Sequence, residues 1–292
     1  MLKLKIKAGR FARRAAWALV ASISFAAMPA HSESKGTVHL AYVEWSSTVA
    51  STNVVRVALE NAGYDVKTTS LAGAAMWQSV ASGDADALLA GWLPTTHEDY
   101  FEQLGDQVED LGPSLDGTKL GLVVPAYTDI SSIDELNDHA DALNGEIIGI
   151  DPGAGLQRLS GEVVEKYELN LRLRDGSDAT MTAALGNAID NNEDIVVAGW
   201  TPHWMFARWD LKYLDDPKGI YGGAEQIHTI VRKGLKEDMP GAYAILYNFA
   251  WTADDMGEVM LMNEQDDSDP YENAKKWVEE NTELVNQWAA AD

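Results

Sequence analysis

A short pattern occurs twice in this chain, at an offset of 108 residues. The stretch "AGWLPTTHEDYF" occupies residues 90–101, and "AGWTPHWMFARW" occupies residues 198–209. In both, Ala-Gly-Trp follows an apolar run and a proline stands two residues after the tryptophan. An internal repeat constrains a fold strongly, because each copy has to form the same kind of structural unit.

The repeat extends beyond these stretches at the same offset and without gaps. "VHLAYVEW" (38–45) aligns with "EIIGIDPG" (146–153), and both are short apolar runs that enter a turn. "DLGPSLDGTKLGLVVP" (110–125) aligns with "KGIYGGAEQIHTIVRK" (218–233), and both predict a Gly-rich loop followed by a strand. We therefore expect two copies of a β-α-β-type unit.

Helical patterns separate the predicted strands in each copy. "STNVVRVALENAG" (51–63) and its counterpart "LSGEVVEKYELN" (159–170) carry apolar residues at helical spacing. This alternation predicts an α/β fold of two lobes, each a mostly parallel sheet flanked by helices. The strands "LGLVVP" and "IHTIVR" end the copies, and we expect them to cross between the lobes. After about residue 234 the chain predicts further helices, in "KEDMPGAYAILYNF", "ADDMGEVMLMN" and "DPYENAKKWVEENTELVNQWAAA".

Three tryptophans, Trp45, Trp92 and Trp200, each lie where a predicted strand enters a turn. Ligands of open parallel sheets bind outside the carboxyl ends of the strands, so facing lobes would bring these indoles to one cleft. An aromatic cage of this kind binds quaternary ammonium groups, because the cation meets the negative faces of the rings. The alternative is that they are core residues. We expect that role for the tryptophans in helical patterns, which are Trp77, Trp204, Trp209, Trp251, Trp277 and Trp288.

The segment "GIDPGAGL" (149–156) lies between a predicted strand and a predicted helix. Its glycines allow backbone N–H groups at a helix N-terminus to face an anion, either a carboxylate or a phosphate. A plain turn between strand and helix explains the same residues. His97, five residues after Trp92, is a candidate donor to the same carboxylate, and the alternative is an ordinary residue at a helix start.

Nothing in the chain predicts a catalytic, cofactor or metal site. There is no G-x-S-x-G, no H-E-x-x-H, no calcium loop, and neither a P-loop nor a complete dinucleotide fingerprint. The chain has no cysteine, which excludes disulfides, thiolate metal sites, a cysteine nucleophile and a lipid-anchored cysteine. We therefore expect a binding protein without cofactor, and a secreted enzyme is the alternative.

The N-terminus predicts secretion. Six Lys and Arg residues precede the uncharged apolar run "AAWALVASISFAAM" (15–28), and small residues near Ala30 and Ser32 suit cleavage. This pattern predicts a signal peptide at 1–32, whereas a membrane anchor needs about 18 or more apolar residues. Its removal changes the formal charge from −24 to −30. Such a protein should avoid nucleic acid, and we interpret its acidity as a solubility device rather than as a sign of a cationic substrate.

Several long motifs together resemble the glycine betaine-binding proteins of ABC importers. They are "AYVEWSSTVASTNVV", "MWQSVASGDADALLAGWLPTTH", "GTKLGLVVP", "IIGIDPGAGL" and "VVAGWTPHWMF…LKYLDDPK", and the resemblance covers about residues 37–290. It implies that Trp45, Trp92 and Trp200 surround a trimethylammonium group. It also implies that the carboxylate is held by the backbone amides of Gly155 and Leu156 and by His97. Family members often have Ile in place of Leu156, which matters little for a backbone donor.

The resemblance further implies a two-lobed periplasmic binding protein that closes on its ligand. We expect lobe 1 at 33–120, completed by helices at 230–292, and lobe 2 at 121–229. The implied partners are a membrane permease and an ATPase on other chains, and the implied form is a soluble monomer in the periplasm. Related methylated solutes remain alternative ligands: choline, proline betaine, dimethylsulfoniopropionate and trimethylamine N-oxide.

Overall fold

The computed structural model describes residues 34–290, so the predicted signal peptide at 1–32 lies outside the described part of the chain. Within it, the strands form one hydrogen-bonded path in the order β2-β1-β3-β9-β4-β7-β5-β6, and β8 pairs with β4. The strands are β1 (Thr37–Tyr42), β2 (Asp65–Ser70), β3 (Ala87–Leu93), β4 (Val108–Pro125), β5 (Glu146–Ile148), β6 (Arg172–Arg174), β7 (Val197–Thr201), β8 (Leu211–Tyr213) and β9 (Glu225–Arg232).

This path contains two sheets, one for each lobe. In the first lobe β1 pairs in parallel with β2 and β3, and in the second lobe β5 pairs in parallel with β6 and β7. The predicted α/β class with two lobes is confirmed. The parallel order is limited to these three strands per lobe, because β9 and β4 add antiparallel pairings to the first sheet, and β4 and β8 add them to the second.

The long strand β4 belongs to both sheets. Its residues 108–118 pair with β9 in the first lobe, and its residues 119–123 pair with β7 in the second. The prediction of a Gly-rich loop ahead of "LGLVVP" is wrong, since this segment is strand throughout. The pairing of β4 with β9 shifts register around Pro113 and between Asp116 and Thr118. The Gly and Pro residues therefore lie within the strand, at irregular points of this pairing. The expected crossing between the lobes is therefore present, but it is made by the whole of β4 and not by "LGLVVP" alone.

The second expected crossing differs from the structure. Among the described residues β9 pairs only with β3 and with the first part of β4, so "IHTIVR" lies inside the first sheet. The chain returns from the second lobe in the irregular segment 214–224, which precedes β9. A strand and a loop, not two strands, connect the lobes.

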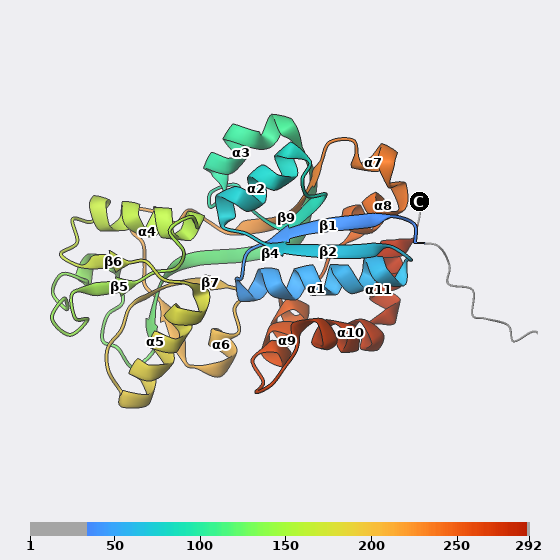
Figure 1. Ribbon diagram of the computed structural model, residues 1–292. Helices are drawn as coiled ribbons and strands as arrows, with labels where there is room; N and C mark the ends of the chain where they lie inside the picture. The colour runs from blue at the N-terminus through green and yellow to red at the C-terminus, as the bar shows by residue number, and fades with distance from the viewer. Residues whose placement is uncertain (1–33, 291–292) are drawn as a thin grey trace, which may run out of the picture. The chain divides into compact units, whose positions relative to one another are not determined.

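Helices cover both faces of each sheet (Figure 1). In the first lobe α1 packs on β1, β2 and β3, and α9 and α10 pack on α1. The predicted final helix is two helices, since the chain breaks at Asn281. The helices are α1 (Ser46–Asn61), α2 (Gly73–Ser82), α3 (Glu98–Leu104), α4 (Gly155–Lys166), α5 (Asp178–Asn191), α6 (Met205–Arg208), α7 (Leu235–Asp238), α8 (Pro240–Asn248), α9 (Ala253–Asn263), α10 (Pro270–Glu280) and α11 (Thr282–Ala289).

The tryptophans of the helical patterns mostly form the core, as expected. Trp77 on α2 and Trp277 on α10 are fully buried, and Trp288 on α11 stacks on Trp277 at 6.5 Å between ring centroids. Trp251 is buried too, but it lies in the connection between α8 and α9. None of the helices in residues 34–290 has both the length and the apolar character that a bilayer crossing requires.

Candidate ligand-binding site

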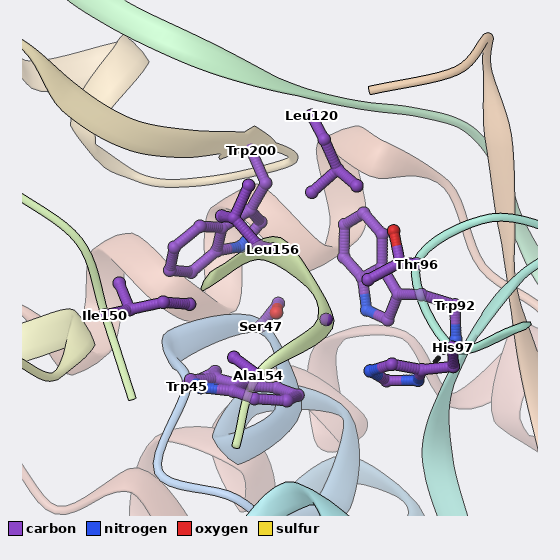
Figure 2. Close-up of a pocket in the computed structure, with 11 residues that line it drawn as sticks. Trp45, Ser47, Trp92, Thr96, His97, Leu120, Ile150, Ala154, Leu156 and Trp200 are labelled. Carbon is purple, nitrogen blue, oxygen red and sulfur yellow. Dashed lines mark hydrogen bonds between the residues drawn. The ribbon is translucent and has the colours of Figure 1, made fainter. Parts of the chain in front are cut away.

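The residues that the sequence singles out lie around one cavity between the lobes (Figure 2). Trp45, Trp92, Trp200, His97, Gly155 and Leu156 all line it. They come from four separate parts of the fold: the start of α1, the end of β3 with the turn after it, the start of α4, and β7. The cavity is also lined by Ser47, Thr96, Leu120, Ile150 and Ala154.

Three indoles face a common space in Figure 2. Trp45 is the residue immediately before α1, whereas Trp92 and Trp200 lie in equivalent positions near the ends of β3 and β7. All three side chains belong to residues that are at most 6% exposed. Each of the two strand tryptophans is followed, after one residue, by a proline joined through a cis peptide bond. The repeated pattern in the sequence thus corresponds to two matched walls of one cavity.

The glycine before each strand tryptophan has a packing reason. A Cβ on Gly91 would lie 2.9 Å from Ile230 Cγ1, and a Cβ on Gly199 would lie 2.6 Å from Val123 Cγ2. In both lobes the neighbouring antiparallel strand therefore places an aliphatic side chain over the glycine. This close approach explains the glycine of the repeated Gly-Trp pair.

His97 is buried beside these rings and is neutral. Burial lowers the pKa of His97 to about 3. Its Nδ1 accepts the backbone N–H of Trp92 at 3.1 Å, and the indole N–H of Trp77 lies 3.4 Å from the same nitrogen. Because Nδ1 is an acceptor, the proton of the neutral ring must be on Nε2. That N–H is buried without a partner among the described residues, and Figure 2 shows the ring directed into the space beside Trp45.

The start of α4 supplies further free donors. Its N-cap residue, Ala154, makes no side-chain cap, whereas α5 is closed by a capping box at Ser177. The N–H groups of Gly155 and Leu156, the first two of α4, form no hydrogen bond with other residues of the described chain. Such orphan donors at a helix N-terminus favour an anion.

Gly155 is required by a close approach between the lobes. A Cβ at this position would lie 2.0 Å from the backbone oxygen of Thr96 and 2.8 Å from its Cγ2. The turn that carries His97 thus touches the start of α4 directly. His97, the residue after Thr96, lines the cavity together with Gly155 and Leu156.

Two carboxylates join the lobes around the cavity. The Trp45 indole N–H donates to Asp151 Oδ2 at 2.8 Å, and the Ser46 backbone N–H donates to Asp178 Oδ2 at 2.7 Å. Asp178 is also bonded to Nε2 of His203, at 3.0 Å, and the His203 ring lies edge-on to Trp200. Burial alone would raise the pKa of Asp178, but His203 and the Ser46 N–H lower it, and the net shift is downward.

A second set of contacts joins α4 to the α3 region. The Tyr100 hydroxyl donates to the carbonyl oxygen of Gly153. Arg158 forms a salt bridge with Asp99 at 2.9 Å and donates to the carbonyl oxygen of Thr95 at 3.3 Å. Both sets connect residues of one lobe with residues of the other, so they depend on the lobes being close together.

The sequence did not single out several residues of the cavity and of its support. Ser47, Ala154, Leu120 and Ile150 all lie within motifs quoted above, but none of them was named as a site residue. Leu120 and Ile150 carry only the apolar signal of any buried segment. The pairing of Trp77 with His97 had no signal either, since its helical pattern predicts core packing alone. Within residues 34–290 there is no group of three His, Asp or Glu residues that could hold a metal ion.

Comparison with known families identifies the chain. A family model described as the substrate-binding domain of an ABC-type glycine betaine transport system matches residues 36–280. The chain belongs to this family. The resemblance inferred from the motifs is thereby confirmed, and the two-lobed architecture is that of the family's solved members.

Individual relatives differ in the ligand that they bind. Lactococcal OpuAC, solved in a closed, liganded conformation with glycine betaine, is 46% identical, with a TM-score of 0.83 over 87% of this chain and 100% of that chain. An ABC-transporter choline-binding protein, solved with choline, is 29% identical, with a TM-score of 0.80 over 86% of this chain and 91% of that chain. GbuC of Listeria monocytogenes, a glycine betaine/carnitine transport binding protein, is 50% identical over 164 residues, which are 55% of this chain and 54% of GbuC. This last match therefore spans about half of that relative.

Proposed function

We propose that this chain is the substrate-binding protein of an ABC importer and that its ligand is glycine betaine. The trimethylammonium group would lie between Trp45, Trp92 and Trp200, because a methylated cation is attracted to ring faces and needs no hydrogen-bond acceptor. The carboxylate would accept hydrogen bonds from His97 Nε2 and from the N–H groups of Gly155 and Leu156. The zwitterion thus has a matching group for each of its ends.

The observation that carries this proposal is the buried, unpartnered Nε2–H of His97. A buried donor without an acceptor costs about 1–3 kcal/mol, and a ligand carboxylate would remove that cost. Choline has no carboxylate and can offer the donor only a neutral hydroxyl oxygen, which is a weaker acceptor. The choline-binding relative is the reason to test choline as the second candidate, but these donors favour glycine betaine.

We propose that binding closes the two lobes. The hydrogen bonds from Trp45 to Asp151 and from Ser46 to Asp178 cross the cleft, so they would form on closing and be exchanged for water on opening. The moving parts would be 33–120 with 230–292 and 121–229, joined by β4 and by the segment that leads into β9. Since β9 begins at Glu225, the second joint would lie ahead of this residue rather than at residue 230.

We propose further that the protein is exported by the segment 1–32 and acts as a soluble monomer in the periplasm. It would deliver the ligand unchanged to a permease that is driven by an ATPase. The basic start and the apolar run of the segment support export, and the absence of cysteine from the sequence supports a form without a lipid anchor.

A titration panel tests the proposal. Calorimetry and tryptophan fluorescence should give saturable binding of glycine betaine and weaker binding of choline. Proline betaine, carnitine, dimethylsulfoniopropionate and trimethylamine N-oxide would rank the remaining methylated solutes. Mass spectrometry of the ligand after incubation should show no chemical change. Binding of none of these solutes, tighter binding of choline than of glycine betaine, or conversion of the ligand would each overturn the proposal.

A further inference from the structure

Glu225 is a buried carboxylate that forms no ion pair within residues 34–290. It is 2% exposed and is the first residue of β9. In the β4–β9 ladder it lies opposite Thr118, and the next residue of β4, Lys119, already pairs with β7 of the second lobe. Glu225 therefore lies at the junction of the two lobes, although no motif in the sequence marks it.

The hydrogen bonds that Glu225 accepts come from two consecutive residues. Its Oε1 accepts the backbone N–H of Thr95 at 2.5 Å and that of Thr96 at 2.8 Å, and its Oε2 accepts the hydroxyl of Thr96. A buried carboxylate without a cation depends on such donors. The segment ahead of β9 packs on the same turn, since a Cβ on Gly222 would lie 2.8 Å from Thr95 Oγ1. The turn and the junction therefore hold each other in place.

The opposite side of this turn forms part of the ligand site. The backbone oxygen of Thr96 occupies the space that a Cβ on Gly155 would need. His97 follows directly, and its N–H donates to the Trp92 carbonyl oxygen at 2.9 Å while its ring accepts from the Trp92 N–H. The position of Thr96 thus sets how far the Nε2–H of His97 lies from the free N–H of Gly155.

We propose that Glu225 is a positioning residue for the carboxylate of the ligand. It lies outside the residues that line the cavity and acts through the Thr95–Thr96 turn, which it ties to the junction of the lobes. The inference rests on the proposed function and adds a selectivity: loss of Glu225 affects ligands that carry a carboxylate more than ligands that carry only a quaternary ammonium. Of the three indoles proposed to bind the ammonium group, Trp45 and Trp200 belong to other elements, and Trp92 is held in β3 by its pairing with Ile227 of β9.

The test compares three variants at this position with glycine betaine and choline as probes. Glu225→Met keeps the length of the side chain and removes both acceptors. Glu225→Gln keeps an acceptor for the two backbone N–H groups, and its amide can donate to Thr96 Oγ1. Glu225→Asp keeps the charge but withdraws it from the turn by one methylene. Thr229→Val, a nearly isosteric change of a buried and unpartnered hydroxyl on the same strand, is the matched control.

We expect E225M and E225D to weaken glycine betaine binding by about tenfold or more and choline binding by less than about threefold. E225Q and T229V should stay within about threefold of the parent for both ligands. In a chain that already carries His97→Asn, E225M should weaken glycine betaine binding by no more than about a further threefold, because the donor that Glu225 positions is absent. This coupling separates positioning from a general loss of structure.

Equal losses for both ligands, a loss that persists in full in the H97N chain, or a loss in E225Q as large as in E225M would each overturn the inference. If melting shows that E225M does not fold, E225D decides, since an unchanged ratio of the two affinities in E225D overturns the inference as well. A parent chain that binds neither ligand overturns the proposed function and this inference with it. A parent that binds glycine betaine, with variants that lose no selectivity, overturns this inference alone.

Discussion

Replacing His97 by asparagine isolates one hydrogen bond in the proposed site. In the parent the Nδ1 of His97 accepts the Trp92 N–H, and the Nε2–H is the donor that the structure leaves free. The Oδ1 of asparagine lies near the place of Nδ1, so it can still accept from Trp92. No atom of asparagine reaches the place of Nε2. H97N therefore removes the donor and keeps the turn.

The expected loss follows from the burial of this donor. A hydrogen bond to a charged group contributes about 1.5–3 kcal/mol, and about 1.4 kcal/mol corresponds to a factor of ten in affinity. H97N should therefore weaken glycine betaine binding by roughly 10- to 150-fold. Binding should not vanish, because the indoles and the N–H groups of Gly155 and Leu156 are unchanged. Choline can offer Nε2 only the oxygen of a neutral hydroxyl, so its affinity should fall less, by less than about threefold.

Calorimetric titrations of parent, H97N and His97→Gln with both ligands at pH 7.5 give the measurement. The amide nitrogen of glutamine reaches about as far as Nε2, so H97Q should recover part of the affinity for glycine betaine. Thermal melts without ligand control for damage to the fold. A glycine betaine affinity in H97N within threefold of the parent would refute the reasoning, and so would an equal loss for the two ligands.

Three further predictions follow. Alanine in place of Trp92 or Trp200 should weaken glycine betaine binding by about 1–2 kcal/mol or more, and phenylalanine should retain part of it in the same titration. Gly155→Ala should weaken glycine betaine binding and lower the melting temperature, because its Cβ would overlap the Thr96 oxygen. The expected loss of unfolding free energy is about 1–3 kcal/mol. Because His97 has a pKa of about 3 when folded and near 6.5 when unfolded, the unfolded chain binds the extra proton between these values. The parent should therefore lose about 1.4 kcal/mol of unfolding free energy per pH unit as the pH falls through this window, relative to H97N in denaturant titrations.

The walls of the cavity could be predicted because their signals are local. In both copies an apolar run, a Gly-Trp pair and a proline follow one another within a few residues, and the matched offset relates Trp92 to Trp200. The structure places both at strand ends beside the same cavity, together with Trp45, His97, Gly155 and Leu156. That these residues bind a ligand stays a prediction.

The errors occur where distant residues decide the local structure. The Gly and Pro residues at 112 and 113 predict a loop, yet β9, more than 100 residues later, pairs across them and makes them part of a strand. "IHTIVR" has the pattern of a crossing strand, but pairing with β3 and β4 keeps it in the first sheet.

The sequence by itself determined the α/β class, the two matched copies, and the residue types around the cavity. These depend on periodicity, on turn residues and on glycines, all of which are properties of neighbouring residues. Only the tertiary structure decided which nitrogen of His97 is free, that Asp178 accepts the N–H of Ser46, and that Glu225 holds the turn before His97. Each of these depends on a buried polar group and on the partner that satisfies it. For Asp178 and Glu225 that partner lies more than 100 positions away in the sequence. For His97 the fold gives Nδ1 a partner and leaves Nε2 without one among the described residues.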